Sequence, residues 1–141
     1  MASIQEIQNS IVEDFSFLPE WDERYAYLIE LGQKMDPLPE QYRSRNNIVR
    51  GCQSTVWLHS ECRGDKVYFK ADSDSLIVKG LAALLMQVYS GQTAEEVFQA
   101  DLVFFEETGL NKHLSSQRTN GLMAMIEKIQ SFALKCKNGE V

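Results

Sequence analysis

The sequence predicts an α+β domain in which helices surround a small antiparallel β-sheet. Apolar residues recur at helical spacing in the segments near both ends of the chain. Residues 53–60 instead alternate in polarity with the two-residue period of a β-strand. The segment from Leu76 to about Tyr89 is apolar nearly all round a helix, which is typical of a buried central helix. Helices that precede and follow a short sheet are the pattern of the α+β class.

Two helices are predicted before the sheet. Ser3 and Glu6 have the spacing of a capping box, in which each side chain satisfies a free backbone amide of the other residue. Apolar residues at helical spacing then extend this helix to about Phe15. Pro19 suits the first turn of a second helix, which is expected to stop near Gly32.

The middle of the chain is predicted to form a loop and a β-hairpin. Residues 36–50 contain prolines and a polar segment, which are typical of an ordered loop. The strand at residues 53–60 is followed by a predicted turn at residues 61–65 and a return strand at residues 66–71. Residues 72–75 supply several polar side chains suited to cap the central helix.

Further helices are predicted after the central one. A capping box at residues 93–96 opens a short helix, another covers residues 102–108, and the last helix begins near Ser115 or Ser116. No linker, repeat or low-complexity tract interrupts the chain, so one domain over residues 1–141 is predicted. The apolar stripe of the last helix consists of Leu122, Met125, Ile126, Ile129, Phe132, Ala133 and Cys136.

Charge and composition argue against several classes of function. The net charge of −6 opposes nucleic-acid binding, because phosphates need a basic face. The longest apolar stretch, Leu81–Met86, is far shorter than the roughly 20 residues of a membrane span. The N-terminus shows no signal-peptide pattern, and three cysteines at irregular spacing argue against a disulfide framework. The sequence therefore predicts a cytoplasmic protein with reduced cysteines, which binds neither nucleic acid nor membranes.

Cys52 is the main candidate for chemistry. It follows Gly51, which allows a tight turn or a positive φ, and it precedes the first predicted strand. The thiol is therefore expected on a projecting loop, where functional side chains gather. Cations promote the reactive thiolate, and arginines occur nearby at positions 43, 45 and 50. From the residues alone, a reactive cysteine and an incidental one are equally compatible with this pattern.

The other two cysteines are predicted to have no chemical role. Cys62 falls in the predicted hairpin turn, where it is expected to be an incidental surface thiol. Cys136 falls on the apolar stripe of the last helix, where a free cysteine acts as a small hydrophobic residue. Cys52 and Cys62 lie at opposite ends of a strand of about eight residues at roughly 3.3 Å each. They are too far apart to bind one metal ion, whose sulfur ligands lie about 4 Å from each other.

Histidines and charged residues give weaker signals. His113 precedes the last helix and is a better site candidate than His59, which falls on a predicted strand. A Cys–His nucleophile pair would also need an orienting third group, which no spacing indicates. Asp72 and Asp74 are interpreted as helix caps rather than as an acid pair. Arg118 opposes the dipole of the last helix, so we expect it to contact a carboxylate or a partner protein.

With these residues in place, the chain resembles the SufE family of sulfur-acceptor proteins. The resemblance extends from about Phe15 to Phe132 and is sharpest at residues 51–57, 72–81 and 113–122. It implies a SufE/NifU-like α+β fold, related to that of the IscU scaffold.

By this resemblance, Cys52 accepts sulfur as a persulfide from a pyridoxal-phosphate cysteine desulfurase of the SufS or CsdA type. The protein would stimulate that enzyme and pass the sulfur to an iron–sulfur scaffold complex of the SufBCD type. It would not be an enzyme itself and would need no cofactor, because the pyridoxal phosphate belongs to the desulfurase. Family members commonly dimerise, which implies a possible homodimer. The residues expected to shape the loop or the docking surface are Arg50, Gly51, Gln53, Ser54, Asp74, His113 and Arg118.

Two alternative functions remain open at this point. A cluster scaffold of the related fold carries three ligand cysteines, and this sequence keeps only the first of them. Asp72–Asp74 and Leu114 stand where the other two are expected. A peroxide-sensing thiol protein would need a resolving cysteine near Cys52. Within one chain the predicted strand keeps Cys62 away, although a dimer could bring the two together.

Overall fold

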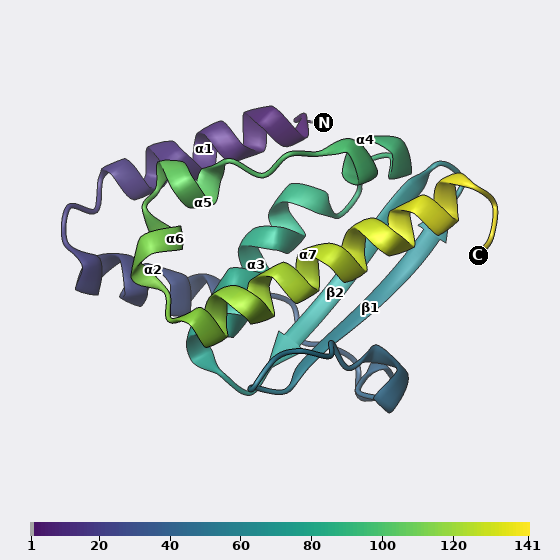
Figure 1. Ribbon diagram of the computed structural model, residues 1–141, viewed down its shortest axis with the longest axis horizontal. Helices are drawn as coiled ribbons and strands as arrows, with labels where there is room; N and C mark the ends of the chain where they lie inside the picture. Colours follow the sequence, from purple (N-terminus) through teal and green to yellow (C-terminus); the bar gives the residue numbers. More distant parts are fainter. Residues whose placement is uncertain (1) are drawn as a thin grey trace.

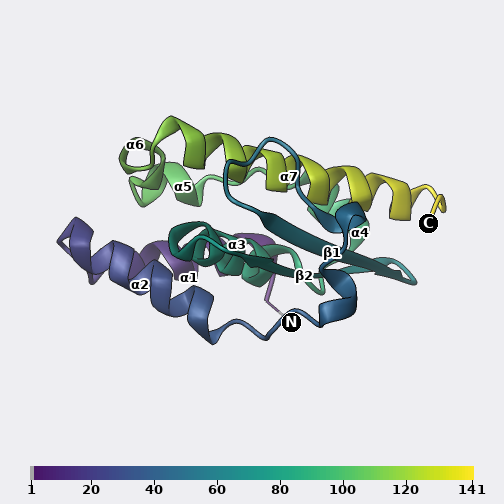
Figure 2. The same cartoon turned by 90° about the horizontal axis from the view of Figure 1, so that it is seen from below.

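The fold is a two-stranded antiparallel sheet packed among helices. The computed structural model describes residues 2–141. Figure 1 shows the long helix α7 running over the two strands, and Figure 2 places the helix α3 between α7 and α2. The α+β class is confirmed. The elements are α1 (Ile4–Ser16), α2 (Trp21–Lys34), the 3₁₀ helices η1 (Glu40–Tyr42) and η2 (Arg45–Asn47), β1 (Val56–Arg63), β2 (Lys66–Ser73), α3 (Leu76–Tyr89), α4 (Ala94–Gln99), α5 (Phe104–Glu107), α6 (Leu110–His113) and α7 (Ser116–Lys137).

Serine or threonine side chains cap α1, α3, α4 and α7 close to the predicted positions. The capping box of α1 is present, with Ser3 Oγ 3.1 Å from the amide nitrogen of Glu6 and the reciprocal bond also formed. Ser75 caps α3 through its hydroxyl. The interpretation of Asp72 and Asp74 as caps of this helix was wrong, because Asp74 binds the amide of Thr55 and Asp72 binds the side chains of Arg43 and Lys79 instead of the amides at the start of α3. A local pattern cannot show such partners, since they come from distant parts of the chain.

The central helix is as buried as its sequence predicts. Leu81, Leu85 and Val88 of α3 are each inaccessible to solvent, and residues on its other sides are also buried. The helix contacts α1, α2, α7 and strand β2. Within residues 2–141, no helix combines the length and apolarity that crossing a membrane requires.

The hairpin is longer and its turn is tighter than predicted. β1 and β2 pair from Val56–Ser73 to Arg63–Lys66, so only Gly64 and Asp65 form the turn. Gly64 has φ 62°, which suits the first central position of a two-residue hairpin turn. The predicted turn at residues 61–65 was therefore too long. The side-chain alternation of β1 continues through Cys62 as a result.

This register brings Cys62 to α7. Val56 and Leu58 are buried on the face of β1 that α7 covers, and Cys62 belongs to the same face. Cys136 occupies its predicted place on the apolar stripe of α7 and forms a disulfide with Cys62, with a Cα–Cα distance of 5.8 Å. The predictions of a free surface thiol at Cys62 and of no disulfide were wrong. The predicted turn had removed Cys62 from the strand and so from the facing helix.

Two glycines let α2 and α3 pack with their backbones in contact. A Cβ atom built at Gly80 would lie 2.6 Å from the carbonyl carbon of Leu28, and one at Gly32 would lie 2.9 Å from the Gly80 amide nitrogen. These positions hold backbone atoms of rigid helices, which cannot turn away as a side chain can. The closeness of the two helices therefore depends on glycine at both positions.

We expect Gly80→Ala to lower the free energy of unfolding by about 3 kcal/mol, because overpacking forces α2 and α3 apart. Urea denaturation followed by circular dichroism measures the change. The matched control is Gly121→Ala in α7, where the nearest neighbour is a movable side chain. Equal stability of the two variants would show that the α2–α3 contact tolerates a methyl group.

Candidate functional site

The Cys52 loop lies just before β1, and a backbone hydrogen bond joins the residues on either side of it. The amide of Val49 donates a hydrogen bond to the carbonyl oxygen of Val56 at 2.8 Å, and both side chains are buried. Gly51 has φ 94°, a conformation that side chains other than glycine rarely adopt. The predicted role of this glycine is confirmed. The loop carries Cys52 toward α7.

The thiol of Cys52 lies against the backbone of α7. Its Sγ atom is 3.6 Å from the carbonyl oxygen of Gly121, and the side chain is partly buried. A Cβ atom at Gly121 would lie 3.2 Å from this sulfur, so the absent side chain makes room for the thiol. Cys52 is the free cysteine of the chain, since Cys62 and Cys136 are bonded to each other. Nucleophilic sulfur chemistry is therefore available at Cys52.

A cavity of about 380 Å³ opens beside the thiol. Its walls come from the Cys52 loop and from the starts of α3 and α7, so three distant segments build it. The thiol is thus sheltered but not sealed into the interior. The lining residues are Cys52, Gln53, Ser54, Ser75, Val78, Ser115, Gln117, Arg118 and Gly121.

Burial raises the pKa of the Cys52 thiol above its ordinary value, because a partly dehydrated site disfavours the thiolate. The upstream arginines do not offset this effect. The Arg43 guanidinium binds Asp72 and lies 5.0 Å from the ring centre of Trp57, while Arg45 and Arg50 are exposed. The thiolate, which is the reactive form, is therefore disfavoured while the thiol lies against α7.

Residues at the C-terminal end of β2 bind Thr55, at the C-terminal end of the Cys52 loop. Asp74 accepts a hydrogen bond from the amide of Thr55 at 3.1 Å, and the Ser73 hydroxyl donates to the Thr55 carbonyl at 2.9 Å. Asp72 pairs with Arg43 and, at 3.2 Å, with Lys79. Burial raises the pKa of Asp72, but these cations and the Ser73 amide together hold that pKa below its usual value. The two aspartates therefore fix the loop rather than act on the thiol.

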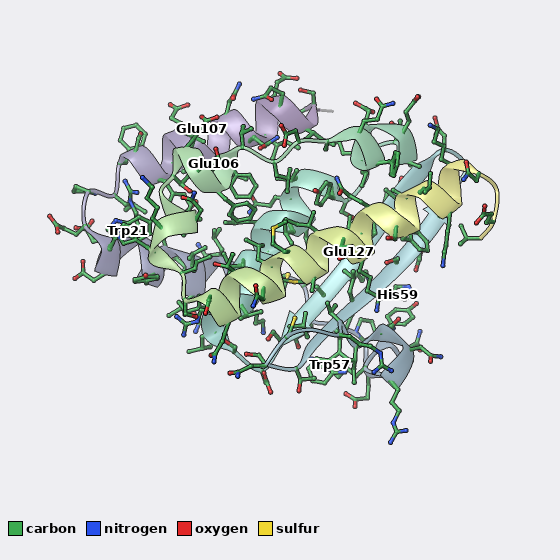
Figure 3. The ribbon with its side chains drawn as sticks, viewed as in Figure 1. Trp21, Trp57, His59, Glu106, Glu107 and Glu127 are labelled. Atoms are coloured by element: carbon green, nitrogen blue, oxygen red, sulfur yellow. A yellow bond between two sulfur atoms is a disulfide. The ribbon has the colours of Figure 1, made fainter. Side chains whose placement is uncertain are left out.

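The two remaining charged candidates lie in different places. Arg118 is exposed and lines the cavity, and it forms no ion pair with a carboxylate of residues 2–141. His113 does not line the cavity. Its ring stacks on Trp21 with centres 3.7 Å apart, and its carbonyl accepts a hydrogen bond from the Tyr25 hydroxyl. Trp21 lies at the opposite end of the molecule from Trp57 and His59 (Figure 3).

Several residues of the site were not predicted from the sequence. Gly121 is the most informative of them, because it forms the floor beneath the sulfur. A glycine inside a helix costs stability, so it indicates a close approach of some other group. That signal shows that something packs there, but it does not identify the thiol. Ser75, Val78 and Gln117 line the cavity without any distinctive local pattern.

We expect Gly121→Ala to push the thiol out of its place and to speed the alkylation of Cys52. The added methyl group would displace the sulfur, which then regains water, so the thiol pKa falls toward its ordinary value. Rates of iodoacetamide alkylation, measured by intact mass across a pH series, report both changes. Lys135→Ala, an exposed position at the far end of α7, serves as the control. Unchanged rates and an unchanged pH profile in Gly121→Ala would refute this account of the thiol's resting place.

The chain is similar to known proteins over most of its length. The family model described as "SufE: Fe-S metabolism associated domain" matches residues 9–133. A SufE-like protein of Rhizobium meliloti (strain 1021) is 45% identical over 130 residues, which cover 89% of this chain and 93% of that protein. A SufE-like protein of Rhizobium etli is 42% identical over 138 residues, covering 94% and 90% of the two chains.

A solved structure shows the same fold. The solution structure of a hypothetical protein from Thermus thermophilus matches with a TM-score of 0.77 and 25% sequence identity. The match covers 94% of this chain and 96% of the other. The family match includes the Cys52 loop, both strands, α3 and most of α7, and it confirms the resemblance found in the sequence. The chain is a member of the SufE family, whose domain is associated with iron–sulfur metabolism.

Proposed function

We propose that Cys52 accepts a sulfur atom as a persulfide from a cysteine desulfurase and delivers it to an iron–sulfur scaffold complex. One observation carries the proposal: the free thiol of a SufE-family chain sits on a projecting loop beside an open cavity. A buried structural cysteine would have no such opening. The opposite extreme, a fully exposed thiol, would leave a bound persulfide open to other reagents.

The transfer step balances without any external oxidant or reductant. The Cys52 thiolate attacks the outer sulfur of the donor persulfide and forms a new S–S bond. The S–S bond of the donor breaks, and its electron pair stays on the donor cysteine. That cysteine takes up a proton as Cys52 gives one up. The products are a Cys52 persulfide and a free thiol on the desulfurase.

The resting geometry gives the loop two roles. Against Gly121, the thiol is partly dehydrated, which favours its protonated form. The same sheltered position would protect a persulfide on Cys52 from other reagents. Extension of the loop into the donor site would hydrate the sulfur and raise its thiolate fraction. Gln53, Ser54 and Arg118 line the cavity and are the residues we assign to partner contact.

The remaining parts of the proposal concern the protein's partners and setting. The chain acts as a sulfur carrier and desulfurase activator, can form a homodimer, and holds no cofactor of its own. The pyridoxal phosphate that cleaves cysteine belongs to the desulfurase. We do not propose a cluster scaffold, because Cys62 and Cys136 are bonded to each other rather than turned toward Cys52.

Intact mass spectrometry tests the proposal directly. The protein is incubated with a pyridoxal-phosphate cysteine desulfurase and cysteine, without a reductant. We expect the intact mass to rise by about 32 Da, one sulfur atom, and a non-reducing digest to place that sulfur on the peptide that contains Cys52. Omission of cysteine is the control. A protein that gains no sulfur from an active desulfurase, or gains it elsewhere, contradicts the proposed function.

A further inference from the structure

A second cavity lies on the other side of the Cys52 loop. It has a volume of about 520 Å³ and is formed by the segment around η2 together with the middle of α7. Three of its side chains are cationic and one is acidic. We call it the basic groove. Its lining residues are Arg45, Asn46, Ile48, Val49, Arg50, Ala124, Glu127, Lys128 and Ser131.

The basic groove and the thiol cavity are neighbours, because different residues of α7 and of the chain around Cys52 border each of them. Gly51 approaches Ala124 in the groove, with its Cβ position 3.6 Å from the Ala124 methyl group. One turn earlier on α7, Gly121 contacts Cys52 in the thiol cavity. Arg50 lines the groove and is two positions from the reactive cysteine. A partner bound in the groove would therefore lie directly beside the loop that delivers sulfur.

The positive charge of the groove is not neutralised within residues 2–141. Arg45 and Arg50 are exposed and form no ion pair with any carboxylate of that range. Lys128 Nζ donates only to neutral groups, the carbonyl oxygens of Asn46 and Ile48, at 3.4 and 3.3 Å. Burial and the charge of Arg50 lower the pKa of Lys128, which agrees with this unbalanced charge.

This concentration of cations is notable in a chain whose net charge is −6. Some cations elsewhere are paired locally, since Lys34 pairs with Glu30, Lys137 with Glu95 and Lys79 with Asp72. In the groove, Glu127 is a single carboxylate beside three cations. Guanidinium groups bind carboxylates through paired hydrogen bonds, so the free groups suit carboxylate ligands. An extended polyanion such as nucleic acid suits the groove less well, because it would also contact the acidic surface around the groove and be repelled by it.

We propose that the basic groove binds a short acidic segment, with at least two carboxylates, on the protein that donates sulfur to Cys52. This inference rests on the proposed function. The groove fixes the orientation of the donor, so that the donor cysteine lies over the neighbouring thiol cavity. Charge pairs at such an interface govern encounter and register more than the chemical step. The groove should therefore change the desulfurase concentration that gives half-maximal sulfur transfer, and it should leave the rate of transfer at saturating desulfurase unchanged.

Sulfur transfer at varied desulfurase concentration tests this prediction. The variant is Arg45→Gln/Arg50→Gln, whose exposed guanidinium groups make no hydrogen bond within residues 2–141. The control, Lys34→Gln/Lys66→Gln, makes the same change in net charge at exposed positions that do not line the groove. We expect the groove variant to raise the half-saturating concentration roughly three- to tenfold at low ionic strength, with the saturated rate kept. Equal effects of the two double variants, or no effect of the groove variant, overturn the proposal.

A peptide titration separates this proposal from the proposed function. Hexaglutamate is added to the isotope-labelled wild-type protein, with hexaglutamine as the neutral control, and amide shifts are followed by NMR. We expect shifts at Arg45, Arg50 and Lys128 that the groove variant loses. If wild-type protein takes up no sulfur, the proposed function fails, and this titration alone decides whether the groove binds carboxylates. Shifts spread equally over other cationic surfaces, or no shifts, count against the groove.

Discussion

Cys52→Ser is expected to abolish sulfur uptake from a desulfurase supplied with cysteine. A serine hydroxyl ionises far less readily than a thiol and cannot form a persulfide. The exchange is nearly isosteric, and the thiol makes one weak hydrogen bond, to the Gly121 carbonyl oxygen. We therefore expect the stability to change by no more than about 0.5 kcal/mol, so the loss is chemical rather than structural. Intact mass and thermal denaturation of the same preparation measure both quantities.

The double variant Cys62→Ser/Cys136→Ser is the control for this experiment. Both sulfurs lie in the disulfide at the hairpin end of the molecule, away from the cavity of Cys52. This variant should still gain one sulfur. Uptake that persists in Cys52→Ser, or vanishes in the double variant despite a folded protein, would remove Cys52 from its proposed role.

Reduction of the Cys62–Cys136 disulfide is expected to lower the free energy of unfolding by about 4 kcal/mol. The bond joins positions 74 residues apart, and a cross-link over such a distance restricts the unfolded chain strongly. It also ties the turn end of the hairpin to the last turns of α7 (Figure 1). The corresponding fall in Tm is roughly 10–20 °C for a domain of this size. Thermal denaturation with and without dithiothreitol measures it.

Cys62→Ala/Cys136→Ala identifies the origin of that effect. We expect this variant to melt at a lower temperature than the oxidised wild type and to show no response to dithiothreitol. Sulfur uptake at Cys52 should survive below the lower Tm, because the cavity and the disulfide lie at different ends of β1. A wild-type Tm that does not respond to the reductant would mean that the bond adds no stability.

Much of the fold follows from local patterns in the sequence. The capping box at Ser3 and Glu6, the alternation of β1 and the apolar α3 are confirmed, because each depends on residues a few positions apart. The same reasoning failed at Asp72 and Asp74. Their position before α3 suggested caps, but Arg43 and Thr55 bind them from other parts of the chain.

In the candidate site, too, some features follow from local sequence and others from contacts between distant parts of the chain. The sequence by itself determined the longer helices, the hairpin and the projecting loop at Gly51–Cys52, since local backbone preferences and side-chain periodicity encode them. It did not indicate the short helices η1, η2 and α6. Tertiary structure alone decided that the thiol rests on Gly121, 69 positions away, and that Cys62 bonds to Cys136, 74 positions away. It also decided the raised pKa of Cys52 and the unpaired cations of the basic groove. These properties depend on which distant segments pack together, and that packing reflects the burial of the whole core rather than any local pattern.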